Sequence, residues 1–263
     1  MQRLSFFRNL WRAFLVVAYF LHAAAELVIT RPQTRPERAA WLSRFCSRIL
    51  RALDVTFTVK GTIPNSGAII SNHLTYVDIM LHSAIHPVVF VSKVELRSTP
   101  LLGWMSMMSG TVYVARGRGG SASKAAEGMA KGFRDGLPVV FFPEGTTGVG
   151  DEVAMPFRSG LIAQAIEAGA PIVPAFIRYA IPARDIAAGR TLRNDVHWGP
   201  QGLVAHIWSF LSLHGLHATM QFGEEPIVFS DLARSDRKTA AVEAQRAVVS
   251  LSAAPAFETE SPV

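Results

Sequence analysis

The stretch AIISNHLTYVD, residues 68–78, joins a short apolar run to a polar turn and then to the start of a helical pattern. A second stretch, LPVVFFPEGTT at residues 137–147, also leads an apolar run into a polar turn. Each stretch predicts a buried strand that ends beside an ionisable side chain. In open α/β folds, ligands bind where the strands end, so both turns are candidate site positions.

Strand-like and helix-like segments alternate along the chain from residue 54. Period-two alternation and apolar runs are typical of strands, whereas a Ser start and a Gly end are typical of helices. We predict strands at 54–61, 68–71, 88–92, 111–115, 137–143, 171–180 and 218–227, and helices at 77–85, 121–136, 159–169 and 231–251. This order predicts an α/β layered domain with a mixed, largely parallel central sheet flanked by helices.

The first 53 residues predict a membrane-associated helical hairpin. The apolar segment 13–30 is near the lower length limit for crossing a hydrocarbon core of roughly 30 Å. Residues 35–53 place apolar side chains at helical spacing opposite several arginines, as an amphipathic helix does. Spanning and shallow insertion both remain open. A cleaved signal peptide is the disfavoured alternative, because the apolar run is long and Arg31-Pro32 follows it.

Composition favours a membrane surface over nucleic acid. Hydrophobic residues make up 49% of the chain and charged residues 17%, whereas about 25% charged residues is usual in a soluble protein. Residues 1–53 hold nine arginines and two glutamates. Because these positive charges bracket the apolar segment, anionic lipid headgroups explain them better than nucleic acid does. The single cysteine, Cys46, excludes an internal disulfide and a Cys-rich zinc site, and we expect it to be a buried hydrophobe.

His73 and Asp78 form the first candidate catalytic pair. His73 follows a predicted strand, and Asp78 stands five residues later at the start of a predicted helix. Across such a turn, Asp78 can reach one imidazole nitrogen and leave the other nitrogen as a base. The alternative is that His73 closes the turn and Asp78 caps the helix.

The second turn has its own chemistry. Glu144 and Gly145 open a stretch of small residues, whose backbone N–H groups can point at an oxyanion. Glu144 can hold a substrate hydroxyl, or it can be a solvated side chain at a strand end. A third element, GTVYVARGR at 110–118, delivers Arg116 and Arg118 into a glycine-rich loop that suits a phosphate group.

A metal site is the competing interpretation of the first motif. Asp78, His82 and His86 share one face of a predicted helix and can together hold a metal ion. His86 adjoins Pro87 at the helix end, and the sequence has no supporting carboxylate motif. We therefore predict no metal and no other cofactor.

Taken together, these motifs resemble the glycerolipid acyltransferase family, which includes 1-acylglycerol-3-phosphate acyltransferases. NHLTYVD looks like the His-x4-Asp block of that family, and FPEGTT (142–147) is similar to its third block. The resemblance covers roughly residues 55–225 and includes weaker likenesses in GTVYVAR (110–116) and PIVP (171–174). It implies that His73 is the general base and that Asp78 orients it. It assigns acceptor binding to Arg116, Glu144, Gly145 and Thr146, and places 171–174 near an acyl channel.

One departure from the family pattern concerns the acceptor. The third block commonly ends in Arg, but this chain has Thr147. Charge-assisted contacts are the strong ones, so the missing guanidinium weakens the case for a phosphate-bearing acceptor. FPEGTT is more similar to the branch that acylates lyso-ornithine lipid. Arg116, Arg118 or Arg158 can replace the missing charge.

The resemblance implies a membrane-bound O-acyltransferase that moves an acyl group from acyl-CoA or acyl carrier protein to a lysolipid. The leading acceptor is 1-acyl-sn-glycerol-3-phosphate, and lyso-ornithine lipid is the alternative. A non-catalytic lipid-binding membrane protein is the alternative of another class, and a hydrolase using a His-activated water is a third. We expect anchoring helices at 1–53, an acyltransferase domain at 54–251 and a flexible tail at 252–263. Membrane lipids and the acyl donor are the expected partners, nucleic acid is not, and the expected location is the cytoplasmic face of the cell membrane.

Overall fold

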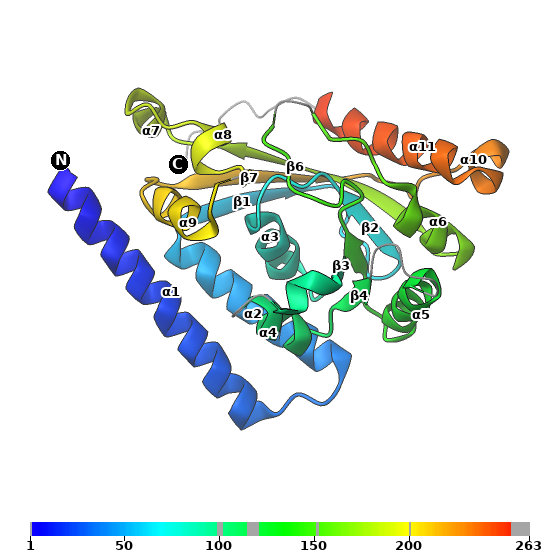
Figure 1. Cartoon of the computed structure of the whole chain (residues 1–263), viewed down its shortest axis with the longest axis horizontal. Helices are drawn as coiled ribbons and strands as arrows, with labels where there is room; N and C mark the ends of the chain where they lie inside the picture. Colours follow the sequence, from blue (N-terminus) through cyan, green and yellow to red (C-terminus); the bar gives the residue numbers. More distant parts are fainter. Residues whose placement is uncertain (1, 99–101, 115–120, 151–152, 200, 254–263) are drawn as a thin grey trace.

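The centre of the protein is a seven-stranded sheet with the order β1-β7-β6-β2-β5-β3-β4 (Figure 1). The structure, a computed structural model, describes residues 2–98, 102–114, 121–150, 153–199 and 201–253. Neighbouring strands are parallel except β6 and β7, which are antiparallel. The strands are β1 (Val55–Lys60), β2 (Ala68–Ser71), β3 (Val89–Lys93), β4 (Val112–Val114), β5 (Val139–Phe141), β6 (Ile172–Ala180) and β7 (Leu216–Phe222). The predicted α/β class with a mixed, largely parallel sheet is confirmed.

Helices cover both faces of this sheet. The elements α1, α2, α3 and α9 contribute to one apolar cluster, and α5, α6, α10 and α11 contribute to the other. The helices are α1 (Gln2–Thr30), α2 (Arg35–Ala52), α3 (Val77–Ile85), α4 (Leu102–Met108), α5 (Ser121–Arg134), α6 (Ser159–Glu167), α7 (Ala183–Ala187), α8 (Leu192–Asp195), α9 (Leu203–Leu211), α10 (Asp231–Ser235) and α11 (Arg237–Ser250). Short 3-10 turns lie at Val94–Ser98 and Leu251–Ala253.

Strand β2 shows why the sheet is buried on both faces. Successive side chains of a strand point to opposite faces. Ile69 therefore joins the cluster with α2 and α3, while Ile70 joins the cluster with α6 and α11. Both side chains are almost fully buried. A continuous apolar run, rather than alternation, is the pattern that such a parallel strand needs.

Several segments differ from the sequence-based expectation. The last strand begins at Leu216 and ends at Phe222, earlier than the expected 218–227. The expected helix 231–251 is broken at Asp236, whose carboxylate accepts the N–H groups of Lys238 and Thr239 and so caps α11. The helices α4, α7, α8 and α9 were not predicted.

Helix α2 belongs to the core as much as to the hairpin. A capping box starts it, because Thr34 accepts the N–H of Glu37 while Glu37 accepts the N–H of Thr34. Its buried face includes Trp41, Phe45 and Ile49 and packs against α3. Cys46 lies on this face, and burial raises the pKa of its thiol to about 12. The domain boundary at residue 53 stays a prediction.

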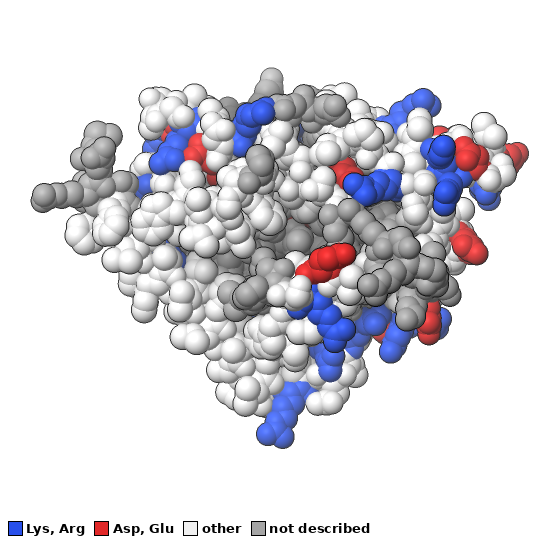
Figure 2. Space-filling model, in the orientation of Figure 1, with Lys and Arg blue, Asp and Glu red and all other residues white. Residues whose placement is uncertain are grey.

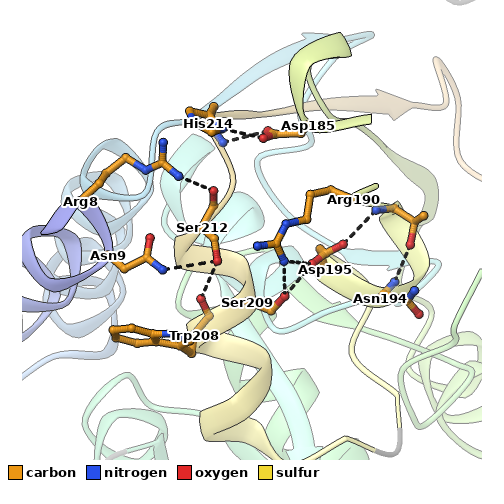
Figure 3. Close-up of polar contacts among 11 residues, drawn as sticks. Arg8, Asn9, Asp185, Arg190, Asn194, Asp195, Trp208, Ser209, Ser212 and His214 are labelled. Atoms are coloured by element: carbon orange, nitrogen blue, oxygen red, sulfur yellow. Dashed lines mark hydrogen bonds and ion pairs between the residues drawn. The ribbon is translucent and has the colours of Figure 1, made fainter. Parts of the chain in front are cut away.

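Arginines hold the N-terminal helix to the end of α9, and Figure 3 shows the contact of Arg8 with Ser212. Arg8 donates to the carbonyl oxygen of Ser212, and Arg12 donates to the carbonyls of Leu211 and Leu213. The last carbonyls of a helix have no partner within the helix and carry its negative dipole end. The two guanidinium groups therefore satisfy the end of α9 and fix α1 against it.

The other half of α1 is tied to α2. Glu26 accepts hydrogen bonds from Arg44 at 2.7 Å and Arg48 at 2.9 Å, and Trp41 donates its indole N–H to the Ala23 carbonyl at 3.0 Å. One face of α1 is thus occupied along its length, and Figure 1 shows α1 lying alongside α2 at the edge of the molecule. Four of the nine N-terminal arginines are engaged in these internal contacts.

The outward face of α1 is apolar. Phe6–Thr30 is long and apolar enough to cross a membrane by length and composition. Its most apolar 18-residue stretch has a mean hydropathy of 1.9, and 11% of that stretch is buried. Its exposed large apolar side chains are Phe6, Phe7, Leu10, Trp11, Phe14, Val17, Leu21, Val28 and Ile29. Figure 2 shows an uncharged surface along the edge that α1 occupies in Figure 1.

Replacing Arg12 with Met should release α1 from the body. The variant loses the bonds to two carbonyls and to Asp54, and a buried hydrogen-bonding group left unsatisfied costs about 1–3 kcal/mol. We expect amide hydrogen exchange in α1 to increase while exchange in β2 and β5 stays slow. The control is Arg51→Met, because Arg51 is exposed and donates to Ser47 in its own helix. Unchanged protection of α1 in Arg12→Met would show that these contacts do not hold it.

Candidate active site

Both sequence motifs lie at the carboxyl ends of neighbouring strands. His73 follows β2, Glu144 follows β5, and these two strands pair in parallel at the centre of the sheet. The connection after β2 runs through α3 on one face. The connection after β5 runs through α6 on the other face. This divergence of chain paths is where open α/β sheets bind ligands.

The predicted pair of His73 and Asp78 is formed. The Nδ1 atom of His73 lies 2.8 Å from Oδ2 of Asp78. The Asp78 side chain is fully buried, and the His73 side chain keeps 15% of its surface exposed. An ionised carboxylate only accepts hydrogen bonds, so the imidazole donates from Nδ1 to Asp78 and its Nε2 atom keeps a free lone pair.

The turn itself holds Asp78 in place. Its Oδ2 atom also accepts the backbone N–H groups of Leu74 at 2.7 Å and Thr75 at 2.9 Å. Asp78 lies in the first turn of α3, where a negative charge is stabilised by the helix dipole. The oxygen that contacts His73 therefore also closes the turn before α3. The helix cap that the alternative assigned to Asp78 is not formed, because Tyr76 is the N-cap residue of α3 and no side chain bonds there.

The ring of His73 is fixed by an aromatic contact. Phe142, the first residue after β5, stacks on it with a centroid distance of 4.0 Å and an interplanar angle of 11°. His82 contacts the same phenyl ring edge-on at 5.9 Å. Stacking of this kind favours both the neutral imidazole and the imidazolium that forms in general-base catalysis.

Asn72 fastens the turn to β6. Its side-chain amide donates to the Ile177 carbonyl at 2.9 Å and accepts the Ile177 N–H at 2.7 Å. The backbone ladder between β2 and β6 runs from Ala68 to Ser71 on the β2 side. The amide of Asn72 therefore continues the ladder with a side chain at the point where the chain turns toward His73.

Glu144 supports the turn that carries His73, reaching it from the end of the neighbouring strand. Its side chain is buried, and Oε1 accepts the N–H of His73 at 2.9 Å. In return, the N–H of Gly148 donates to the His73 carbonyl at 2.8 Å. Gly145 has a φ of 70°, a conformation that residues with a Cβ rarely adopt. The predicted role of Glu144 and Gly145 in acceptor binding stays a prediction.

The amide of Gly145 donates to the Phe142 carbonyl at 3.0 Å and so closes the turn. Thr146, predicted to contact the acceptor, is exposed, and Thr147 is half-buried. Neither of their N–H groups has a hydrogen-bond partner among the described residues. These two amides are therefore the donors of the turn that can meet an oxyanion.

Arg158 lies against the same turn. Its Nε atom donates to the Glu144 carbonyl at 3.2 Å, and its backbone N–H donates to the Pro143 carbonyl at 2.9 Å. Arg158 is exposed to solvent. Arg116 and Arg118, predicted to meet an acceptor phosphate, lie outside the described residues.

The three residues considered for a metal site, Asp78, His82 and His86, bond to different groups. Asp78 is bonded to His73, while Nε2 of His82 faces the Ser71 hydroxyl at 3.4 Å. His86 bonds to the carbonyl of the adjacent Pro87. Within the part of the chain that the structure describes, no group of three or more His, Cys, Asp or Glu residues is placed to hold a metal.

Comparisons with known proteins place this geometry in a family. The acyltransferase family model matches residues 54–178, a range that contains both motifs. The 1-acyl-sn-glycerol-3-phosphate acyltransferase of Neisseria meningitidis is 30% identical over 80% of this chain and 78% of its own length. The chain belongs to the acyltransferase family.

Two further likenesses are to a second curated relative and to a solved structure. The lyso-ornithine lipid O-acyltransferase of Pseudomonas aeruginosa is 36% identical over 53% of this acyltransferase and 52% of its own length. The match thus spans about half of that relative. The crystal structure of the 1-acyl-sn-glycerophosphate acyltransferase of Thermotoga maritima has a TM-score of 0.67 and 19% identity, covering 98% of this chain and 100% of that one. It supports the fold alone.

Two side chains of the acyltransferase site were missed by sequence reasoning. Tyr179 donates its hydroxyl to Oδ1 of Asp78 at 2.5 Å, and Phe142 stacks on His73. Phe142 opens the FPEGTT motif, so the motif contained the signal for it. Tyr179 lies in an apolar strand segment and has no such signal.

His82 is a fully buried ionisable group close to His73 and Asp78. Burial lowers the pKa of its imidazole to about 4, more than the nearby Asp78 charge raises it. Its Nδ1 atom has no hydrogen-bond partner among the described residues. The folded protein therefore holds His82 neutral, whereas the unfolded chain protonates it near the ordinary value of 6.5.

Replacing His82 with Leu should flatten the pH dependence of stability. Because the pKa is lower in the folded state, protonation of the unfolded chain removes stability as pH falls from 6.5 toward 4. Between pH 7 and pH 5 the loss in the unaltered protein should be about 2 kcal/mol. Urea unfolding at both pH values measures it.

The quantity to compare is the change in the free energy of unfolding between pH 7 and pH 5, rather than the absolute stability of His82→Leu. His22→Leu is the matched control, because the His22 side chain is 56% exposed. It should keep the slope of the unaltered protein. An equal slope in His82→Leu would show that His82 is not the group responsible.

Proposed function

We propose that this acyltransferase moves a fatty acyl group from acyl-CoA or acyl carrier protein to the free hydroxyl of a lysolipid. Transfer to glycerolipids or lysolipids as a class follows from the family and its relatives. The observation that carries the proposal is the 2.8 Å contact between His73 and Asp78 at the carboxyl end of β2. It leaves Nε2 of a half-buried histidine to take a proton from an alcohol.

The proposed reaction is a direct transfer. Nε2 of His73 takes the hydroxyl proton while the hydroxyl oxygen attacks the thioester carbonyl carbon. The N–H groups of Thr146 and Thr147 donate to the oxyanion that forms. When the tetrahedral intermediate collapses, the carbon–sulfur bond breaks and the proton on Nε2 passes to the departing sulfur. The products are an ester and a free thiol, and the chain's own residues perform each proton transfer.

We propose 1-acyl-sn-glycerol-3-phosphate as the acceptor. Arg158 supports this choice, because its side chain lies against Glu144, and Glu144 in turn bonds to His73. Its terminal guanidinium nitrogens can supply the charge that Thr147 lacks, and a guanidinium matches the geometry of a phosphate. The name of the Neisseria meningitidis relative agrees with this acceptor.

A lyso-ornithine acceptor is the second candidate. Thr147 precedes Gly148, the residue that bonds to the His73 carbonyl, so the departure from FPEGTR lies beside the catalytic turn. The ornithine headgroup has no phosphate to pair with an arginine there. The name of the Pseudomonas aeruginosa relative agrees with this second acceptor.

We further propose that α1 lies in one leaflet on the cytoplasmic face of the cell membrane. A spanning helix is surrounded by lipid, whereas α1 bonds to α2 through Glu26 and to the end of α9 through Arg12. Its apolar outward face suits insertion parallel to the membrane plane. Trp208 of α9 is 42% exposed and contacts Phe6, so the apolar surface continues onto α9.

Replacing His73 with Ala should abolish acyl transfer. General-base catalysis contributes about 10²–10⁴-fold, so we expect the initial rate with labelled acyl-CoA and lysophosphatidate to fall by that factor. Asp78→Asn should lower kcat in the same direction, because the amide keeps an acceptor but loses the charge. His86→Ala is the control, since the His86 side chain bonds to the carbonyl of the adjacent Pro87 and, among the described residues, to no group of the His73 turn. Full activity of His73→Ala in folded protein contradicts the assignment of the base.

Arg158→Gln should discriminate the two acceptors. Loss of a guanidinium–phosphate contact should raise KM for lysophosphatidate by about tenfold or more, and leave KM for lyso-ornithine lipid nearly unchanged. The two acceptors are offered side by side with the same labelled acyl-CoA. If KM rises equally for both, Arg158 supports the turn rather than the phosphate.

Adding Thr147→Arg to Arg158→Gln should restore part of the lysophosphatidate activity, because it returns a guanidinium to the same turn. Thr62→Arg is the matched control, as Thr62 is exposed in the loop after β1. Higher activity of the unaltered protein with lyso-ornithine lipid than with lysophosphatidate would favour the second candidate.

A further inference from the structure

The buried carboxylate of Asp78 is bonded on both oxygens. Oδ2 accepts from His73 and from the amides of Leu74 and Thr75. Oδ1 accepts from the hydroxyl of Tyr179 at 2.5 Å. The Asp78 side chain has no exposed surface, and Tyr179 is 4% exposed. A charge in such a position depends on hydrogen bonds in place of water.

Tyr179 stays protonated across the pH range in which enzymes work. Burial, together with the charge of Asp78 and the hydrogen bond to it, raises the pKa of its hydroxyl well above the ordinary value of 10. The hydroxyl is therefore a permanent, neutral donor to Oδ1. A neutral donor spreads the carboxylate charge and weakens the attraction of Asp78 for a proton on His73.

Strand β6 holds Tyr179 independently of this bond. Tyr179 pairs with Ala218 of β7 in the antiparallel ladder, and Asn72 clamps the backbone of Ile177 two residues earlier. The hydroxyl is thus presented to Asp78 by a fixed backbone. Removing the hydroxyl should leave the ring and the strand in place.

We propose that Tyr179 is a positioning residue that sets the pH range over which His73 works as the base. It acts through Asp78. The hydroxyl stabilises the ionised carboxylate and so weakens the electrostatic attraction between Asp78 and the protonated ring of His73. Without the hydroxyl, Asp78 attracts the imidazolium more strongly, so His73 holds its proton to a higher pH. The proposal rests on the proposed acyl transfer for its kinetic part.

Other ionisable groups face the pair from each packed element. Glu144 reaches the backbone of His73 from the turn after β5. His82 lies one turn along α3 and is held neutral by burial. Tyr76, at the start of α3, has its pKa raised by burial and stays protonated. Tyr179 is the group among these that bonds to Oδ1 of Asp78.

The experiment is the pH dependence of kcat and KM for Tyr179→Phe. On the acidic side of the pH profile, kcat/KM falls as His73 takes up a proton. We expect this acid limb to shift to higher pH by about half a pH unit to one pH unit. KM and the plateau kcat should change by less than about threefold, because the bonds from Leu74 and Thr75 still orient Asp78. A merely structural role would lower the plateau and leave the limb in place, and that result overturns the proposal.

Tyr113→Phe is the matched control. Its hydroxyl bonds to Ser106 at 2.6 Å, so the variant loses one short hydrogen bond without touching Asp78. Its acid limb should coincide with that of the unaltered protein. If the acid limb shifts equally in Tyr179→Phe and Tyr113→Phe, the shift reflects a general loss of packing order in the protein, and the proposal fails.

A second measurement separates this proposal from the proposed function. The titration of the His73 imidazole can be followed by NMR in full-length, histidine-labelled protein without substrate, with His73→Ala to assign the signal. Tyr179→Phe should raise the titration midpoint by the same amount as the acid limb. If the unaltered protein transfers no acyl group, the proposed function fails while the titration still tests Tyr179. If the protein is active and the midpoint does not move, Tyr179 alone is wrongly assigned.

Discussion

The burial of the Asp78 carboxylate is the constraint on which the site depends. A charge without exposed surface is tolerated only if its oxygens are fully bonded. The turn after β2 supplies two amides and an imidazole, and β6 supplies a hydroxyl. The order β6-β2-β5 in the sheet is thus a chemical requirement, since the β2 turn needs β6 on one side and Glu144 of β5 on the other.

This arrangement explains why three segments far apart in the chain act as one site. Asn72 binds the catalytic turn to β6, and Glu144 and Gly148 bind it to the turn after β5. Each link joins a side chain or amide of one strand end to the backbone of its neighbour. A polar network of this type is stable only when its members are satisfied together. Its geometry can therefore hold Nε2 of His73 in one direction.

How much of this the sequence could predict depends on the range of each interaction. His73 and Asp78 are five residues apart, so their spacing in a strand–turn–helix pattern was sufficient. Tyr179 is 101 residues from Asp78, and in a buried strand its hydroxyl is indistinguishable from any aromatic at a core position. Phe142 lay inside a recognised motif. Its stacking on His73 could be predicted only if the pairing of β2 with β5 were already known.

The strands and helices that could be predicted are those with a clear hydrophobic pattern in the sequence. Long apolar runs gave β2, β5 and β6, because a strand buried on both faces has no alternation to obscure it. Helices α7 and α8 have five and four residues, too short for a helical period to show. In 231–251 the apolar spacing continues through Asp236, so the break came from a capping carboxylate rather than from the hydrophobic pattern.

Four of the nine N-terminal arginines have partners within the protein, which charge counting alone cannot show. Their excess suggested lipid headgroups, but Arg8 and Arg12 bond to the carbonyls at the end of α9, and Arg44 and Arg48 bond to Glu26. A cation at the carboxyl end of a helix satisfies orphan carbonyls and opposes the helix dipole. Because α9 also contacts Tyr76 through His206 and Phe210, the helix that anchors α1 packs against the start of α3. The apolar outer surface and the catalytic turn are thereby parts of one packed unit.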